Sequence, residues 1–310
     1  MKALRDAYGD EIMELGKDFP NLYILDADVG KSCKTLDFKE TYPQQYVNVG
    51  IAEQNCADMA AGLATLGKIP FITTYAAFGS MRMVEMIRQE ACYPNQNVKL
   101  MCSHGGLTPA NDGASHQCIE DLGILRTLPN MTVIAPGDYY SCRKLIRKAA
   151  EHYGPTYMRF TRDAIPFVYD EDDDDFEIGK ARMLRDGTDA AIIASGDVLS
   201  LCVRAADALK EEGVNVRLLD MHTIKPLDTE AVKACISDCG VIVTVEDHNI
   251  INGLGSAVCE VVAECGKGHV KRMGVQDRFG ESGPYLELLA DQGVTVDNIA
   301  AEVKNLIAQK

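Results

Sequence analysis

The chain alternates short apolar runs with amphipathic stretches along most of its 310 residues. In the first half, apolar runs such as 21–29, 69–78, 97–106 and 131–137 are separated by segments with helical spacing, among them 2–17 and 80–92. Strands that are apolar throughout are typical of parallel sheets buried on both faces, and helices between them form the crossovers. The pattern therefore predicts an α/β fold with mainly parallel sheets.

A second pattern of the same kind begins at Asp189 and runs through apolar segments 190–196, 214–221, 240–249 and 270–279. The two patterns are separated by a stretch that contains six consecutive acidic residues, 170–175. Such a charge run is typical of a solvated linker. We therefore expect two three-layer α/β/α domains, residues 1–166 and 189–310, joined by an acidic linker over residues 167–188.

Charge and composition exclude several classes of function. The formal net charge of −15 disfavours binding to nucleic acid or to an acidic membrane, because both reward positive charge. The eleven cysteines are scattered singly through apolar segments, as expected of free thiols, and no metal site is predicted in this chain. No window reaches the roughly 18 uncharged apolar residues of a membrane span, and the N-terminal segment is amphipathic. These features predict a cytoplasmic location.

Glu53 is the first candidate for chemistry. It follows the apolar run 46–50, with Gly50 where the backbone turns, and it begins the next amphipathic stretch. An acid at this place is commonly a helix-end carboxylate that the helix dipole stabilises slightly. The alternative is a carboxylate that takes part in a reaction, and this segment alone leaves both open.

A second candidate is the long connection after the apolar run 97–106. It carries His104, Asp112 and His116 together with three glycines. In parallel sheets the loops at the carboxyl ends of strands are where ligands bind. Zinc binding by the two histidines is disfavoured, because no cysteine or third ligand accompanies them. The connection is therefore expected to supply donors, an acceptor and acid/base groups to a ligand site.

Several segments together resemble one family. Between about Arg5 and Gly283 they occur in the family's order and spacing: NVGIAEQN, TTYAAFGSMR, DGASHQ, LRTLPNM, GPTYMRFTR, HNIINGLGSAVCE and DRFGESG. The chain resembles the carboxyl-terminal half of a transketolase, which consists of a pyrimidine-binding domain followed by the family's C-terminal domain.

The resemblance implies a site for thiamine diphosphate. Glu53 would contact N1′ of the aminopyrimidine and favour the imino tautomer that removes the proton from thiazolium C2. Tyr75 and Phe78 would line the pyrimidine pocket. Met81 stands where long transketolases often have an aromatic residue, and its side chain can still cover a ring face. The same match places Asp28 near the thiazolium.

The resemblance also implies substrate contacts. Asp112 would accept a hydrogen bond from a sugar hydroxyl, and His116 would act as a catalytic residue that hydrogen-bonds the donor sugar. No catalytic role is expected for Arg159. Arginine suits a phosphate because its planar fork gives paired charge-assisted hydrogen bonds. The residues expected to hold the sugar phosphate are Arg5, Ser32, His104 and Arg162.

A full-length transketolase also has an amino-terminal domain, in which a G-D-G segment and a later asparagine bind magnesium and the diphosphate. None of the Gly-Asp pairs in this chain continues to a glycine. The resemblance therefore implies a split enzyme, in which a separate N-terminal subunit supplies the Mg²⁺ ligands and this chain is active only with that partner. The expected assembly is a heterotetramer built on a central dimer.

The activity implied is transfer of a two-carbon ketol unit from a ketose phosphate to an aldose phosphate, as in the pentose phosphate pathway. Three alternatives remain at this point. The β subunit of a 2-oxo-acid dehydrogenase has the same pair of domains, and deoxyxylulose-phosphate synthase shares many of the residues. The third alternative is a non-catalytic partner module, which the joint presence of Glu53, Asp112 and His116 disfavours.

Overall fold

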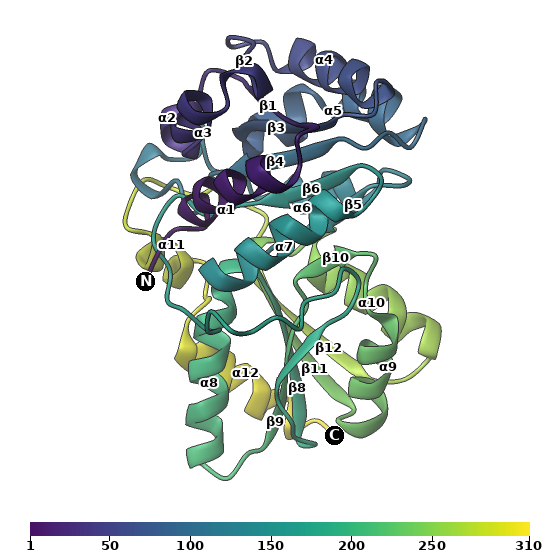
Figure 1. The fold of residues 1–310 in the computed structure, drawn as a ribbon. Coiled ribbons are helices and arrows are strands. Elements are labelled where there is room, and N and C mark those ends of the chain that lie inside the picture. The colour runs from purple at the N-terminus through teal and green to yellow at the C-terminus, as the bar shows by residue number, and fades with distance from the viewer.

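The computed structural model describes residues 1–310 and contains two sheets, each flanked by helices. In Figure 1 the domain formed by the first half of the chain lies above the domain formed by the second half. Two clusters of buried apolar side chains run through both domains.

The first sheet has seven strands in the order β10-β5-β6-β4-β3-β1-β2. All neighbouring pairs are parallel except β10 with β5. Its strands are β1 Leu22–Asp26, β2 Tyr46–Asn48, β3 Ile69–Tyr75, β4 Lys99–Ser103, β5 Thr132–Ile134, β6 Thr156–Arg159 and β10 Thr223–Lys225. The helical elements of this half are α1 Leu4–Asp18, α2 Gly30–Cys33, α3 Leu36–Thr41, η1 Pro43–Gln45, α4 Glu53–Thr65, η2 Phe78–Arg82, α5 Val84–Met86, η3 Ile87–Cys92, η4 Ala110–Asp112, α6 Asp121–Arg126 and α7 Tyr139–Glu151.

The second sheet has five strands in the order β12-β11-β8-β9-β7, and only β7 is antiparallel to its neighbour. Its strands are β7 Arg182–Arg185, β8 Ala190–Ser195, β9 Val216–Asp220, β11 Val241–Asn249 and β12 His269–Val275. The helical elements are η5 Gly196–Val198, α8 Leu199–Glu211, α9 Thr229–Asp238, α10 Leu254–Cys265, α11 Tyr285–Asp291 and α12 Val296–Ile307.

Both sheets are covered on their two faces, as strand β8 shows. Ala190, Ile192 and Ala194 belong to the apolar cluster that contains residues of α8 and α12. Ala191 and Ile193 belong to the cluster that contains residues of α9 and α10. Successive side chains of a strand point to opposite faces, so a strand buried on both faces is apolar at every position. The predicted α/β fold with mainly parallel, doubly covered sheets is confirmed.

The structure departs from the predicted elements in several places. Helices α6 and α7, which no predicted segment covers, lie between strands β4 and β6. The predicted helix 80–92 is helical, but two of its stretches are π-helical. Strand β7 lies within the predicted linker, and β10, from the second half of the chain, pairs with the first sheet. The acidic run itself is largely exposed, in agreement with a solvated segment.

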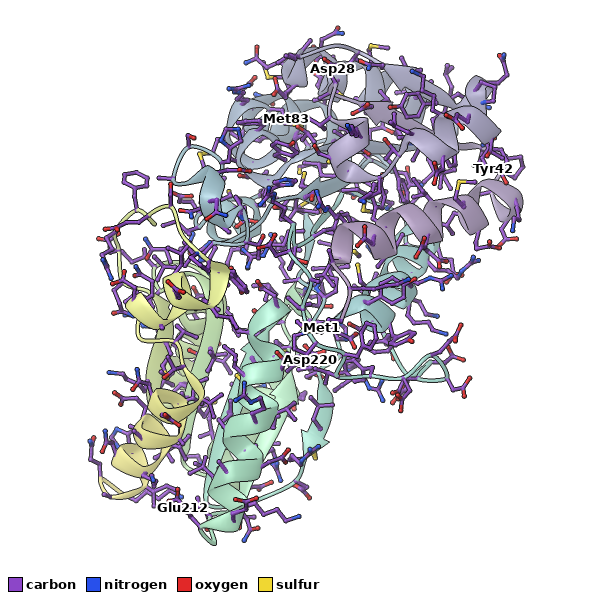
Figure 2. All side chains as sticks on the ribbon, turned by 90° about the vertical axis from the view of Figure 1, so that its left-hand side faces the viewer. Met1, Asp28, Tyr42, Met83, Glu212 and Asp220 are labelled. Atoms are coloured by element: carbon purple, nitrogen blue, oxygen red, sulfur yellow. The ribbon has the colours of Figure 1, made fainter.

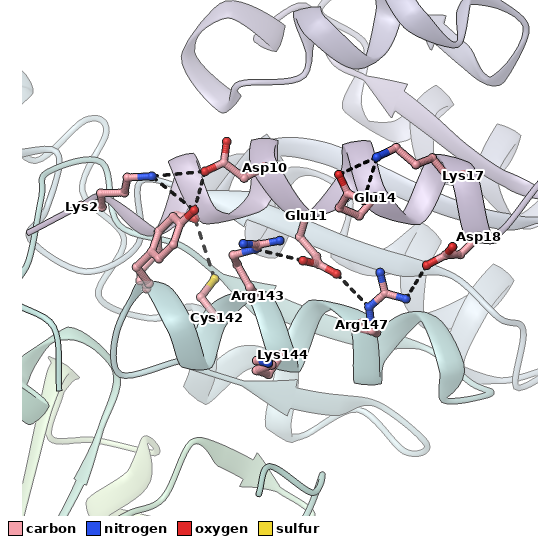
Figure 3. Close-up of polar contacts among 12 residues, drawn as sticks. Lys2, Asp10, Glu11, Glu14, Lys17, Asp18, Cys142, Arg143, Lys144 and Arg147 are labelled. Carbon is pink, nitrogen blue, oxygen red and sulfur yellow. Dashed lines mark hydrogen bonds and ion pairs between the residues drawn. The ribbon is translucent and has the colours of Figure 1, made fainter. Parts of the chain in front are cut away.

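Helices α1 and α7 pack side by side against one face of the first sheet and are joined by ion pairs (Figure 3). The buried carboxylate of Glu11 accepts from Arg143 Nε at 3.0 Å and from Arg147 Nε at 2.9 Å. Arg147 also donates to Asp18 at 2.7 Å. The side chain of Asp138 caps α7 by accepting from the Ser141 backbone N–H.

The two domains meet across a buried polar cluster. Arg159, the last residue of β6, donates to Asp121 Oδ1 at 3.1 Å and to the backbone oxygen of Asp247 at 2.6 Å. Its guanidinium also lies 3.7 Å from the carboxylate of Asp197. Tyr157 donates its hydroxyl to Asp121 at 2.5 Å. A buried arginine is stable only when such partners neutralise and hydrogen-bond it. Arg159 therefore contributes to the contact between the two domains.

No helix of the structure combines the length and the apolar character needed to span a bilayer.

Candidate active site

The predicted site residues gather at one edge of the first sheet. Parallel strands end on the same side, and the loops that leave β1, β2, β3, β4 and β6 carry most of them. Asp28, on the loop after β1, lies at the end of the first domain remote from Glu212 in the second domain (Figure 2). The site therefore extends from the domain junction, near β6, outward to β1 and β2.

Glu53 is held by a turn between β2 and α4. Gly50 has φ of +74°, a conformation that glycine adopts at little cost, and Glu53 is the first residue of the helix. Asn48 fixes this turn, because its side-chain oxygen accepts from the Gly50 N–H at 2.8 Å while its amide donates to Asp28 at 3.0 Å. Asp28 itself has φ of 64°. Asn48 was not among the predicted residues, although it ends the strand that leads to Glu53.

The carboxylate of Glu53 is buried and is paired with one cation. Arg82 Nη1 lies 2.9 Å from Glu53 Oε1. The same guanidinium covers the ring of Phe78, at 4.2 Å from the ring centroid. Sequence reasoning missed Arg82, and the available signal was a cation directly after Met81. Met81 is 42% exposed, so its side chain is only partly covered within this chain.

Four rings form a continuous group beside this pair. Tyr75 stacks on His104 with ring centroids 3.9 Å apart and lies 5.7 Å from Phe78. His116 meets both Tyr75 and Phe78 edge-on, at 6.2 and 6.1 Å. The structure thus brings together two predicted cofactor residues and two predicted substrate residues that are up to 41 positions apart in the sequence.

His104 sits in a constrained and water-poor position. Its φ is 66°, which is uncommon for a residue other than glycine and recurs at functional sites. Its Nδ1 lies 2.9 Å from Ser103 Oγ. Burial, with a smaller contribution from the charges of Arg5, Arg162 and His116, lowers the pKa of His104 to about 3. The imidazole is therefore neutral at physiological pH and can both donate and accept.

Arg5 and Ser32 lie together on the phosphate side of the predicted site. Arg5 Nη1 donates to the backbone oxygen of Ser32 at 3.0 Å, and its Nε is buried without any hydrogen-bond partner. The Ser32 hydroxyl makes no hydrogen bond within the chain. A buried donor without a partner is costly unless a further acceptor satisfies it. These groups fit an anionic ligand such as a phosphate.

Arg162 and Asp112 face each other across the loop after β4, with Nε and Oδ2 3.7 Å apart. The residue predicted to hold phosphate and the residue predicted to read a hydroxyl are therefore neighbours. His116, four positions beyond Asp112, has Nδ1 2.9 Å from Ser115 Oγ. Asp28 and Met81 form no hydrogen bond or ion pair with the other predicted site residues.

The structure contains no group of three or more histidine, cysteine, aspartate or glutamate side chains arranged to hold one metal ion. All cysteines are free thiols. The N-terminus of α10, opened by glycines, is occupied by the chain's own carboxylate: Glu246 accepts from the N–H groups of Leu254 and Gly255 at 2.6 and 2.8 Å.

Comparisons with known proteins cover both domains of the chain. The family model for the transketolase pyrimidine binding domain matches residues 1–167, and the model for the transketolase C-terminal domain matches residues 179–299. A protein of Methanocaldococcus jannaschii named as a transketolase C-terminal section is 45% identical over 97% of this chain and 95% of its own length. A 6-deoxy-6-sulfo-D-fructose transketolase subunit of a Clostridium species is 35% identical over 99% of this chain and 95% of its own length.

A solved structure described as a split gene transketolase, inactive β4 tetramer, superimposes with a TM-score of 0.92 at 43% identity, with 99% of both chains covered. The level of identity and the coverage of both domains are those of members of one family. This chain belongs to the transketolase family and corresponds to its C-terminal section.

Proposed function

We propose that this chain is the C-terminal subunit of a split transketolase, which moves a two-carbon ketol unit from a ketose phosphate to an aldose phosphate with thiamine diphosphate. The observation that carries the proposal is the buried carboxylate of Glu53, which lies beside the ring group of Tyr75 and Phe78 at the carboxyl edge of the sheet. A carboxyl group next to flat rings suits a heteroaromatic ligand with a ring nitrogen.

When thiamine diphosphate is bound, its thiazolium provides an electron sink for cleavage of the bond next to the ketose carbonyl. Glu53 would hold a proton at N1′ of the pyrimidine, which requires the carboxyl to be shielded from water. Tyr75 and Phe78 would orient the pyrimidine ring, and Met81 would cover it from the side. Asp28 would lie near the thiazolium.

The sugar phosphate would be held by Arg5, Ser32, His104 and Arg162. The charges of Arg5 and Arg162 favour an anion at this place, and so does Arg5 Nε, which has no hydrogen-bond partner. The neutral imidazole of His104 adds a hydrogen bond without adding charge. Selection between sugars would then rest on the loop after β4.

Asp112 and His116 would act on the sugar itself. Asp112 would accept from a hydroxyl and so distinguish sugar configurations, because a hydroxyl of the other configuration would point away from this carboxylate. His116 would hydrogen-bond the carbonyl oxygen of the donor sugar and transfer a proton there. Its ring contacts both Tyr75 and Phe78, which places it beside the proposed pyrimidine pocket.

The diphosphate and Mg²⁺ would be bound by a separate N-terminal subunit, and the complex would be a heterotetramer with a central dimer of this chain. The solved split-gene relative supports the division into subunits, because it is described as inactive in the β4 form. The domains would be residues 1–166 and 189–310, with β7 Arg182–Arg185 of the expected linker 167–188 added to the second domain because it pairs with that sheet. A cytoplasmic location and a place in the pentose phosphate pathway are part of the same proposal.

A second substrate class is a sulfonated sugar. The Clostridium relative is named for a 6-deoxy-6-sulfo-D-fructose substrate, and its identity of 35% extends over almost the whole chain. A sulfonate carries one negative charge and three acceptor oxygens, so the arginines that suit a phosphate suit it as well. The two classes are distinguished only by assay.

The test is to purify the chain and mix it with a candidate N-terminal subunit containing G-D-G, in the presence of thiamine diphosphate and Mg²⁺. Ketol transfer is assayed with phosphorylated and sulfonated ketoses, and decarboxylation is assayed with pyruvate. We expect transfer only in the mixture and its loss in Glu53→Gln. Decarboxylation of pyruvate in place of transfer would favour a 2-oxo-acid dehydrogenase subunit, and transfer that survives Glu53→Gln would overturn the proposal.

A further inference from the structure

The connection between β4 and α6 belongs to the first domain, but residues of the second domain contact it. We call residues 104–119 the substrate loop, because it carries His104, Asp112 and His116. Apart from the short η4 turn it has no regular structure. A long loop of this kind is mobile unless other parts of the protein hold it. Its contacts therefore decide how well Asp112 and His116 are placed.

One support is Asp247, at the end of β11 in the second domain. Its Oδ2 accepts from the backbone N–H of Leu107 at 2.9 Å. A Cβ on Gly106, whose φ is +61°, would come within 2.0 Å of the same oxygen. The glycine is therefore required for close approach to the second domain. The N–H of Asn249 also donates to the backbone oxygen of Ile119 at 2.9 Å, at the far end of the loop.

The other support is the segment 277–283 between β12 and α11, which we call the clamp segment. The buried side chain of Gln117 donates to the backbone oxygen of Glu281 at 2.8 Å. A Cβ on Gly280 would lie 2.3 Å from Gln117 Oε1, and a Cβ on Gly113 would lie 2.6 Å from Ser282 Oγ. The clamp segment thus packs against both sides of the stretch that contains His116, and it touches the residue after Asp112.

We propose that the clamp segment positions the substrate loop, so that the second domain sets the placement of Asp112 and His116. Gln117 and Gly280 are the positioning residues, and neither touches the reacting atoms. The domain contact requires glycine at positions 106, 113 and 280. At each of these positions the backbone of one domain lies against a side chain of the other, which leaves no room for a Cβ. The link to sugar selection rests on the proposed function, whereas the mechanical link does not.

The mechanical link is tested on the full chain without its partner, by hydrogen–deuterium exchange of residues 104–119. In Gly280→Ala the added methyl group collides with Gln117, so we expect exchange in the loop to rise roughly two- to tenfold, as the loss of one hydrogen bond produces. Gly283→Ala is the matched control, because a Cβ there meets only Leu288 at 3.5 Å. Equal exchange in the two variants would overturn the proposal.

A second pair of variants avoids added bulk. Gln117→Met removes the bond to Glu281, whereas the control Gln45→Met removes a partly buried glutamine amide that donates to the backbone oxygen of Leu22, at the start of β1, at 2.8 Å. Only the first is expected to loosen the loop. In the assembled enzyme Gln117→Met should raise KM for the sugar by about the same factor, while binding of thiamine diphosphate is unchanged.

A loosened loop with an unchanged KM would overturn the role in sugar binding. If the wild-type complex shows no transfer at all, the proposed function fails, and the exchange experiment still decides the mechanical link.

Discussion

Arg82 and Glu53 form an ion pair in which the side chain of Glu53 is 7% exposed and that of Arg82 is 53% exposed. The Arg82 guanidinium also lies 4.2 Å from the ring centroid of Phe78. Arg82 thus contacts both the carboxylate proposed to bind N1′ and a ring proposed to line the pyrimidine pocket. A pyrimidine that takes up these two contacts would compete with Arg82 for them.

Replacing Arg82 by glutamine should consequently strengthen cofactor binding. Partly exposed ion pairs contribute at most about 1 kcal/mol, so the dissociation constant of thiamine diphosphate should fall by up to about fivefold. Isothermal titration of the assembled complex measures this. Arg88→Gln, an exposed arginine on the same helical stretch, serves as the control. Weaker binding in Arg82→Gln would mean that the arginine assists the cofactor.

Removing one arginine from the predicted phosphate site should affect the sugar and leave the cofactor unaffected. A charge-assisted hydrogen bond contributes about 1.5–3 kcal/mol, so Arg162→Gln or Arg5→Gln should raise KM for a phosphorylated sugar roughly 10- to 100-fold. With a sugar that lacks the phosphate, the variants and the wild type should behave alike. The exposed Arg204, which makes no ion pair, provides Arg204→Gln as a control. A uniform loss on both sugars would contradict a phosphate-binding role.

His104 should make the fold sensitive to acid. The unfolded chain takes up a proton on this residue below about pH 6.5, whereas burial keeps the folded pKa at about 3. Between these values protons favour the unfolded state, so the stability present above pH 6.5 is lost as the pH falls. Urea unfolding at a series of pH values gives the free energy of unfolding as a function of pH. In this range the slope of that free energy against pH should be smaller in His104→Gln than in the wild type, by up to about 1.4 kcal/mol per pH unit. His269→Gln, on the exposed end of β12, should keep the wild-type slope.

The domain contact should depend strongly on Asp121. Its carboxylate accepts from Arg159 and from Tyr157, and all three side chains are buried. Asp121→Ala leaves a buried arginine without this partner and should lower the free energy of unfolding by about 3–5 kcal/mol. Asp186→Ala breaks a pair whose carboxylate is 70% exposed, and it should cost at most about 1 kcal/mol. Denaturant unfolding of both variants is the measurement, and similar losses would refute a special role for the junction.

The sequence was sufficient to predict the sheet and the gathering of the candidate site residues at one of its edges. Glu53, Phe78 and His104 each follow an apolar strand, and parallel strands bring such positions to one edge without any knowledge of distant contacts. The position of these residues at the edge of the sheet was therefore predictable from the local pattern, whereas their proposed roles rest on the resemblance.

Contacts between distant segments could not be predicted in the same way. Nothing near Asp247 or Glu281 indicates that they bind the loop after β4, because the register of two packed domains is a property of the whole fold. Arg82 was adjacent to a predicted residue, yet only the folded structure shows which carboxylate it meets. Of the three loop glycines, Gly106 and Gly113 make room for side chains of the second domain, whereas Gly105 makes room for Arg159.

Strand β10 shows where the units of folding lie. Thr223–Lys225 comes from the second half of the chain but closes the edge of the first sheet beside β5, and Lys225 Nζ donates to the backbone oxygen of Arg126 at 2.9 Å. A fragment that ends near residue 166 would leave β5 as a bare edge, open to pairing with other chains. Expressed alone, the first domain should aggregate, and the intact protein should melt in a single transition. The two domains of this chain thus depend on each other for stability. A chimera with a different second domain would need a strand in place of β10 that pairs with β5.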